Sequence, residues 1–179
     1  MMKRVIILLA FAVSLSFVHA QKIYSTKTGK VSFFSNAPLQ DIEAKTSEVE
    51  SKLAANGQIV FTLLIKGFQF DNQKMEDDFN EDYMESSKYP KASFKGNIAN
   101  IRNVDLSKDG TYPAKVQGDL TLHGVTKEVT ADGTLEVKGS KVTARSKFEI
   151  AVKDFDIGGA LIGKKIANTI AITVDCEYE

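Results

Sequence analysis

The sequence contains few of the residues that most often build covalent or catalytic centres. It has one cysteine, so no intrachain disulfide can form. Of its two histidines, only His123 lies outside the apolar N-terminal segment. A single histidine with no second cysteine cannot supply the common His/Cys zinc-ligand sets. These absences argue against a disulfide-stapled fold, and we predict neither a metal site nor a cofactor.

The single cysteine is interpreted as a packing residue. Cys176 lies on the same alternating parity as a set of apolar residues near the C-terminus, namely Ile170, Ile172, Val174 and Tyr178. An unpaired cysteine is among the most buried residue types in proteins. We therefore predict that Cys176 is buried, although pairing between chains and chemical reactivity stay open as alternatives.

Neither sign of charge dominates. Lys and Arg together number 23, as do Asp and Glu, and the formal net charge is zero. The basic residues form no cluster, so the sequence gives no reason to expect nucleic acid or an anionic membrane surface as a partner.

No apolar run is long enough for a helix that spans a bilayer, which needs about 20 residues. The one candidate begins with Lys3 and Arg4, continues as an apolar run over residues 5–18, and ends at Ala20. This pattern is typical of a signal peptide. We predict cleavage after Ala20, export to the periplasm or beyond the cell, and no stable membrane anchor. Residues 21–179 then have the size of one domain.

The clearest structural pattern lies over residues 120–130, where apolar and polar residues alternate on both sides of a turn at 123–127. Before the turn, one face carries Val116, Gly118, Leu120 and Leu122. After the turn, one face carries Val129, Ala131, Leu135 and Val137. A period of two over arms this long predicts antiparallel strands with one dry and one wet face.

Further strands are predicted over residues 22–28, 30–36 and 39–53. Asn56-Gly57 is a type I′ hairpin signal that leads into residues 59–65, which are apolar on both parities and are predicted to be covered on both sides. Gly139-Ser140 reads as another tight hairpin, before a strand over residues 141–153 that is predicted to be the longest. Such strands curl and close readily, so an all-β antiparallel barrel of about eight strands is the first choice and a two-sheet sandwich the second.

One segment breaks the period of two. Met75, Phe79 and Tyr83 recur four residues apart between acidic residues over positions 73–88. This spacing predicts an inserted amphipathic helix, ended by Pro90. The acidic side chains lack the spacing and central glycine of an EF-hand loop, so an exposed helix face explains them best.

The motifs that could carry catalysis are weak. His123 has no nucleophile elbow near it in sequence, and it is best explained as a residue that shapes a hairpin turn. A smaller weight remains for a ligand contact or proton transfer. The glycine-rich stretch over residues 158–163, within a loop over residues 154–168, lacks the strand–helix context and the lysine–hydroxyl pair of a phosphate-binding loop.

The strongest candidate site is apolar. The side chains predicted to point inward are Phe33, Phe61, Leu63, Ile65, Phe94, Ile98, Leu120, Leu122, Phe148 and Ile150. A barrel of about eight strands is either just filled by such side chains or holds one ligand. The alternation favours a filled core by itself and does not decide between the two.

Several motifs occur in an order and at separations that resemble the YceI-like family. They are Gly29 to Phe33 (GKVSF), Phe79 with Tyr83-Met84, Lys88 to Phe94 (KYPKASF), Leu120 to Lys127 (LTLHGVTK) and Lys153 to Ile157 (KDFDI). The resemblance covers essentially all of residues 21–179. Asp156 stands where the family often has glycine, and a His-Ser pair frequent before the first Val-x-Phe is absent.

The resemblance implies an extended lipocalin-like barrel with an apolar tunnel for an isoprenoid or another long lipid, and it implies neither catalytic residues nor a metal. The helix over residues 73–88 would cover the interior through Phe79, Tyr83 and Met84. We therefore expect a non-enzymatic lipid-binding protein, which could form a homodimer. Two alternatives stay open: an envelope protein of structural or stress-response type with a filled core, and a hydrolase-like enzyme that uses His123.

Overall fold

The computed structural model describes residues 22–179, so the predicted signal peptide lies outside the described residues. The strands are β1 (Ile23–Ala37), β2 (Gln40–Ala54), β3 (Gln58–Leu64), β4 (Gln69–Phe70), β5 (Lys91–Ile98), β6 (Gly110–Leu122), β7 (Val125–Lys138), β8 (Lys141–Ala151) and β9 (Thr169–Tyr178). The helical elements are η1 (Ile65–Gly67), α1 (Gln73–Asp78), the π-helix η2 (Phe79–Tyr83), η3 (Ile101–Asn103) and η4 (Val152–Phe155).

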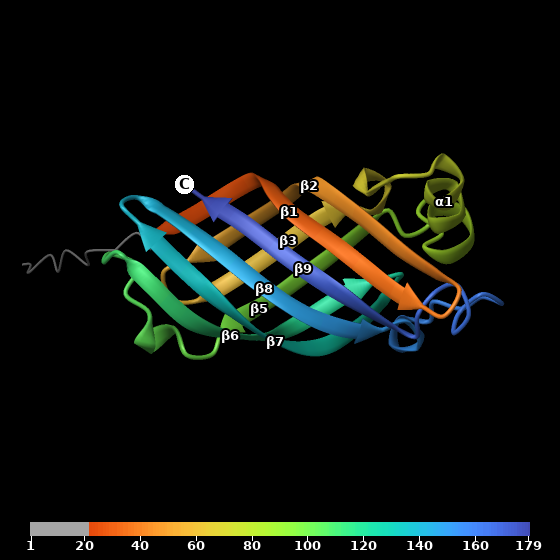
Figure 1. The fold of residues 1–179 in the computed structure, drawn as a ribbon. Helices are drawn as coiled ribbons and strands as arrows, with labels where there is room; N and C mark the ends of the chain where they lie inside the picture. Colours follow the sequence, from red (N-terminus) through yellow and green to blue (C-terminus); the bar gives the residue numbers. More distant parts are fainter. Residues whose placement is uncertain (1–21) are drawn as a thin grey trace, which may run out of the picture.

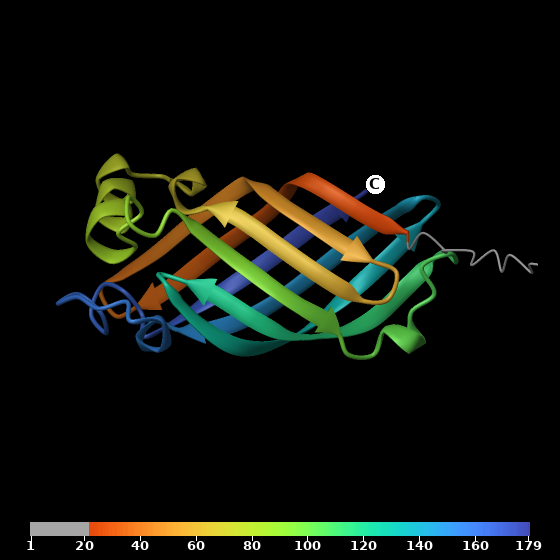
Figure 2. The ribbon, with the colours of Figure 1, turned by 180° about the vertical axis from the view of Figure 1, so that it is seen from behind.

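The strands form a closed antiparallel barrel (Figures 1 and 2). Their order around the wall is β1-β9-β8-β7-β6-β5-β3-β2, and β2 pairs with β1 to complete the ring. The short β4 adds to β2 as an extra strand. The predicted barrel of about eight strands is confirmed, and the sandwich alternative is wrong because the β1–β2 pairing leaves no second sheet.

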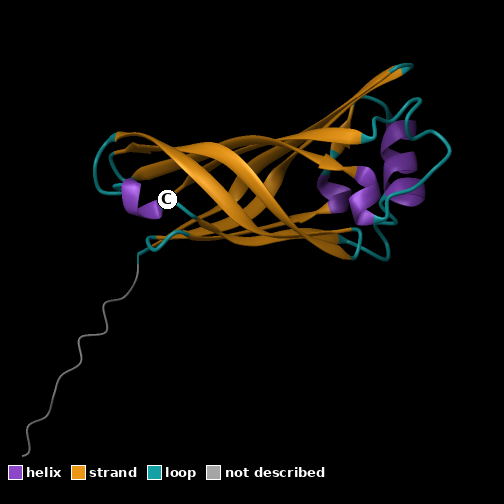
Figure 3. Cartoon of the chain, turned by 90° about the horizontal axis from the view of Figure 1, so that it is seen from below, coloured by secondary structure: helices purple, strands orange, loops and turns teal. Residues whose placement is uncertain are grey.

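The two ends of the barrel differ (Figure 3). We call one end the terminal end: it holds the start of β1, the end of β9, and the β2–β3 and β7–β8 hairpins. We call the other the helix end: it holds α1, η2, η4, and the β1–β2 and β6–β7 hairpins. Every inserted segment except η3 therefore lies at the helix end.

The terminal end is a packed core. Tyr178, Leu53, Val142 and Leu135 are at most 1% exposed there, and Cys176 is fully buried beside them, as predicted. This packing closes one end of the barrel interior.

The alternation of buried and exposed side chains agrees with the prediction on the inner face of the barrel. On the outer face of β3 it differs from the prediction. Ile59 is buried and points inward, but Val60 and Leu64 are 37% and 48% exposed. The prediction that residues 59–65 are covered on both sides is therefore wrong. A barrel wall one strand thick has a single dry face, and an apolar residue on the other parity stays in contact with solvent.

Two strand boundaries also differ from the prediction. The two strands expected over residues 22–28 and 30–36 are one strand, β1, whose pairing with β2 shifts register on both sides of Gly29. β-bulges of this kind bend a strand without ending it. β8 ends at Ala151, because Val152 begins the turn η4, so β1 and β2, with 15 residues each, are longer than β8.

The hairpin turns use positive φ angles at different places from those predicted. At the β2–β3 turn only Gly57 has a positive φ (91°), within a three-residue loop, so this turn is not type I′. The two-residue β6–β7 turn has positive φ at both His123 (50°) and Gly124 (77°), the backbone pattern of type I′. The predicted turn over residues 123–127 is therefore shorter, and β7 resumes at Val125.

The inserted helix is shorter than the predicted span of residues 73–88. The side chain of Asn72 caps α1 by accepting from the Met75 N–H. The chain then widens into the π-helix η2, where the Met84 N–H donates to the Phe79 carbonyl. Glu85 has a φ of 41°, which ends the helical path before Pro90 is reached.

Candidate functional site

The barrel encloses an apolar cavity of about 340 Å³ that runs from the middle of the barrel to the helix end. Ligand pockets in proteins have volumes of this order upward. The packed core at the terminal end bounds the cavity on one side. The interior is therefore not the completely filled core that alternation alone favoured.

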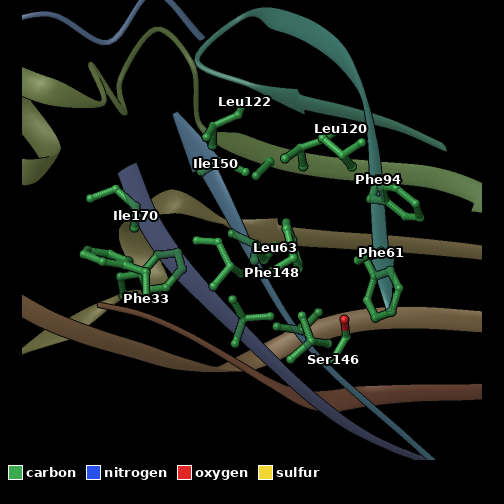
Figure 4. A pocket seen from close by; sticks show the side chains of 18 of the residues that line it. Phe33, Phe61, Leu63, Phe94, Leu120, Leu122, Ser146, Phe148, Ile150 and Ile170 are labelled. Atoms are coloured by element: carbon green, nitrogen blue, oxygen red, sulfur yellow. The ribbon is translucent and has the colours of Figure 1, made fainter. Parts of the chain in front are cut away.

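All the side chains predicted from strand parity line this cavity, and Figure 4 shows several of them converging on it from different strands. They are Phe33, Phe61, Leu63, Ile65, Phe94, Ile98, Leu120, Leu122, Phe148 and Ile150. Ile65 lies in η1 rather than in a strand, yet it is 1% exposed and still faces the interior.

The three side chains expected to cover the interior also line it: Phe79, Tyr83 and Met84. Met84 is 5% exposed and packs with Ile65 and Ile150. Burial raises the pKa of the Tyr83 phenol above its ordinary value, and the carboxylates of Asp82 and Asp78 raise it further. The phenol is therefore neutral near pH 7 and can donate a hydrogen bond.

Four phenylalanine rings close much of the helix end. Phe33 of β1 lies 5.3 Å from Phe68, 5.8 Å from Phe70 and 5.4 Å from Phe79, measured between ring centroids. Phe79 in turn lies 5.8 Å from Phe68 and 5.0 Å from Phe70. This phenylalanine cluster (Phe33, Phe68, Phe70 and Phe79) joins the barrel wall to the helical insertion. The helical insertion therefore packs against the end of the barrel through these aromatic contacts.

Phe68 and Phe70 were missed by the sequence reasoning. Phe68 precedes the two-residue strand β4 and Phe70 ends it, and a strand this short carries no long periodic pattern to mark the inner face. The spacing Phe68-Gln69-Phe70 does alternate, which was the only local signal. Ile157, Leu161 and Ile166, from the loop before β9, also line the cavity and carry no periodic signal at all.

Polar residues line the cavity where β7 and β8 pair (Thr134, Arg145 and Ser146) and at the helix end (Gln40, Asp78 and Lys165). The Asp78 carboxylate is paired with Lys74, at 2.7 Å from its Nζ. An amphiphilic ligand could thus keep a polar group near this end while its apolar part lies in the barrel.

His123 lies beside the cavity but is not among the residues that line it. Its Nδ1 is 3.1 Å from the Phe155 carbonyl oxygen, and its Nε2 is 3.1 Å from Glu85 Oε2. The Tyr89 ring packs edge-on against the imidazole, at 4.7 Å between centroids. Both ring nitrogens are engaged by structural contacts. This arrangement extends the predicted turn-shaping role and gives no support to the enzyme alternative.

Within residues 22–179, no three His, Cys, Asp or Glu side chains form a group suited to a metal ion. In the same range, no helix is both long enough and apolar enough to cross a membrane.

Comparison with solved structures identifies several similar folds. A polyisoprenoid binding domain from Saccharophagus degradans, implicated in plant cell wall breakdown, aligns over 89% of this chain and 99% of its own, with 12% identity and a TM-score of 0.77. BcnA from Burkholderia cenocepacia aligns over 83% and 95%, with 21% identity and a TM-score of 0.71. The YceI protein of Campylobacter jejuni aligns over 80% and 88%, with 17% identity and a TM-score of 0.62.

At these identities the structural matches establish the fold alone. No curated protein sequence matches significantly. The model of one protein family, the YceI-like domain, matches residues 12–178, which is nearly the whole chain. The barrel, its cavity and this match agree with the resemblance seen in the sequence motifs, and the chain belongs to the YceI-like domain family.

Proposed function

We propose that this protein binds a long apolar lipid of the isoprenoid type inside the barrel, and that it sequesters or carries this lipid without chemical conversion. The observation that carries the proposal is the apolar cavity, closed at the terminal end and lined by side chains from most strands of the wall. Each CH₂ group moved from water into such a site contributes about 0.8 kcal/mol. A chain of several prenyl units could therefore bind tightly with few polar contacts.

The choice of an isoprenoid rests on the comparison. The Saccharophagus degradans domain, which shares the fold, is a polyisoprenoid binding domain. The signal-peptide pattern over residues 1–20 supports a site of action in the cell envelope or outside the cell. We propose that the mature protein acts there, without a stable membrane anchor.

The first experiment identifies the ligand. Protein purified from its native compartment is extracted with organic solvent, and the extract is analysed by mass spectrometry. A recurrent prenyl-chain species, at a constant ratio to protein, is the expected result. An extract that holds only the fatty acids of the surrounding membrane would contradict the isoprenoid assignment, and an extract without lipid would contradict lipid binding altogether.

The second experiment places the ligand in the cavity with a matched pair of variants. Leu63 lines the cavity, whereas its neighbour Leu64 points outward and is 48% exposed. Leu63→Asp should abolish lipid retention, because the carboxylate would be buried against an apolar chain, whereas Leu64→Asp should retain lipid. Ala131→Trp, which adds an indole to the cavity wall, tests the same point without a charge. Equal retention in all three variants would rule out the cavity as the site.

A further inference from the structure

The wall of the barrel is not hydrogen-bonded along its full height between β7 and β8. These strands pair from the turn at Gly139-Ser140 only as far as Gly133 and Ser146. Beyond that point β7 continues through residues 125–132 and β8 through residues 147–151, with no backbone pairing between the two stretches in the described chain. In contrast, β6 and β7 pair along the whole of β7's first half, and β8 pairs with β9 from Val142 to Ala151.

The unpaired stretch begins next to a place where β7 and β8 are in close contact. A methyl group on Gly133 would lie 2.4 Å from the Arg145 carbonyl oxygen, so the two backbones are in close contact there. The Ser146 hydroxyl also donates to the Asp132 carbonyl across the pair, at 2.7 Å. The strands therefore diverge from a fixed fork toward the helix end, and they are not loosely paired throughout.

The two unpaired stretches border the cavity. Val129 and Ala131 on the β7 side line the cavity, as do Phe148 and Ile150 on the β8 side. Figure 4 shows Ile150 beside Leu122 and Phe148 beside Leu63, so the β8 side chains face those of other wall strands. We call this unpaired seam the side portal and define its rim as Val129, Ala131, Phe148 and Ile150.

The chain that follows β8 fills the wide end of the side portal. Residues 152–157, here called the closing segment, comprise η4 and the two residues after it. Val152, Phe155 and Ile157 within it are 5%, 2% and 9% exposed, and their cluster includes Leu122 and Val125 of the β6–β7 hairpin. The closing segment thus packs against β7 at the level where β8 would otherwise have paired.

His123 connects the closing segment to two other segments. Its Nδ1 contacts the carbonyl of Phe155 in the closing segment, and its Nε2 contacts the carboxylate of Glu85 after the helix, both at 3.1 Å. A carbonyl and a carboxylate only accept hydrogen bonds, so the ring bonds to both when both nitrogens carry a proton. The His123 side chain is only 9% exposed, whereas the Glu85 side chain is 47% exposed, so the contact with Phe155 is the better shielded of the two.

The backbone has a positive φ angle at or next to each of these contacts. Among residues 22–179, the non-glycine residues with positive φ are Glu85 (41°), His123 (50°) and Asp156 (53°). Glu85 and His123 meet at the imidazole, and Asp156 directly follows Phe155, whose carbonyl meets it on the other side. Residues in this region cost conformational energy and persist when their surroundings hold them in place. The three non-glycine residues with positive φ in the described chain therefore meet at one imidazole: His123 carries it, Glu85 contacts it, and Asp156 follows the residue whose carbonyl contacts it.

We propose that the lipid enters and leaves the barrel sideways, through the side portal between β7 and β8, and that His123 is a positioning residue that holds the closing segment over it. This inference rests on the proposed function. The terminal end is blocked by its packed core, and the phenylalanine cluster covers part of the helix end. The side portal instead has an apolar rim. The closing segment that covers it can move away without breaking the hydrogen bonds between the strands of the barrel.

The test measures exchange kinetics of a defined probe, 11-(dansylamino)undecanoic acid, by stopped-flow fluorescence on the delipidated full-length mature protein. His123→Gln carries its two N–H donors on a single nitrogen, so it cannot place one donor on each side as the two ring nitrogens do. Its association and dissociation rates should both rise, by roughly ten- to a hundredfold for lost hydrogen bonds to charged groups, while the equilibrium constant stays within about twofold. Glu85→Asn removes one partner and tolerates the positive φ, so it should show a smaller rise in both rates.

The matched control is Asp109→Ala. Asp109 accepts a hydrogen bond from the Gly139 N–H at 2.8 Å, so it fastens the same strand pair at the opposite end of the barrel. This variant should leave both rates unchanged. Amide hydrogen exchange supplies a readout without ligand: residues 152–157 should exchange faster in His123→Gln and not in Asp109→Ala.

Each alternative outcome has a distinct meaning. If Phe79→Ala accelerates both rates and His123→Gln does not, the lipid uses the helix end, and the side portal is overturned. A change only in the dissociation rate of His123→Gln would make the residue a ligand contact, which also overturns the inference. If the wild-type protein fails to bind both the probe and prenyl alcohols of several lengths, the proposed function itself fails. That result is separate from any effect of the variants on hydrogen exchange.

Discussion

The Phe33 ring of β1 stacks on the Phe79 ring of the helical insertion, with 5.4 Å between centroids and 25° between ring planes. Phe79 also contacts Phe68 and Phe70, so one side chain connects the insertion to three others at the helix end. Aromatic pairs of this kind contribute about 0.5–1.5 kcal/mol each beyond the area they bury. The attachment of the insertion is therefore concentrated in Phe79.

Phe79→Ala should lower the free energy of unfolding by about 2–4 kcal/mol, because it removes a large half-buried ring and its aromatic contacts. Denaturant unfolding measures the loss, and faster amide exchange over residues 73–83 would assign it to the insertion. Phe34→Ala is the matched control. Phe34 follows Phe33 in β1 but points outward, and it is 41% exposed. Its cost should be within about 0.5–1 kcal/mol. Similar losses in both variants would contradict the role given to Phe79.

The inner face of the barrel was predictable because strand alternation is a local property. Leu120 and Leu122 could be assigned to one face from their neighbours alone, and the structure places both on the cavity. Barrel closure was inferred only indirectly, from strand length. Closure also needs β1 to pair with β9, whose residues are more than a hundred positions away in the chain, so no local pattern could specify it.

Two kinds of feature escaped prediction. The helix was expected to reach residue 88 because Met75, Phe79 and Tyr83 keep a helical spacing, but the chain widens into a π-helix that the spacing does not reveal. The side portal arises because β7 and β8 each continue their alternation after their pairing stops. Alternation reports which face of a strand is dry and does not report whether its edge is paired.

A second pair of residues gives a prediction about the closed end of the barrel. The Ser51 hydroxyl donates its one proton to the Val60 carbonyl at 2.8 Å, so it must accept the proton of the Tyr178 hydroxyl, also at 2.8 Å. Ser51→Ala leaves the buried Tyr178 hydroxyl without its acceptor and should cost about 2–3 kcal/mol. Tyr178→Phe leaves the bond to Val60 intact and should cost about 1 kcal/mol. Urea unfolding of both variants measures the order, and the reverse order would contradict this assignment of donors.

Cys176 should not react with thiol reagents in the folded protein. It is fully buried, and burial raises its thiol pKa to about 11. The thiolate is the reactive form, so at pH 8 both access and ionisation oppose reaction. Ellman's reagent should detect no thiol in the native protein and one per chain in guanidinium chloride. Thr173→Cys, at an exposed position of the same strand, should react at once without denaturant. Rapid labelling of native wild-type protein would contradict the buried placement.

The same thiol should make stability depend on alkaline pH. Its folded pKa of about 11 exceeds the ordinary value of 9.0, so between these two values the folded state binds more protons than the unfolded state. The stabilisation is complete below pH 9 and is lost as the pH rises toward 11, with a slope of at most about 1.4 kcal/mol per pH unit. Burial of Tyr178 raises its phenol pKa as well and adds a slope of the same sign. Cys176→Ala keeps Tyr178 and removes only the thiol, so its unfolding free energy should fall less steeply from pH 9 to 11 than that of the wild type. Parallel curves for the two proteins would mean that the thiol does not titrate with a raised pKa.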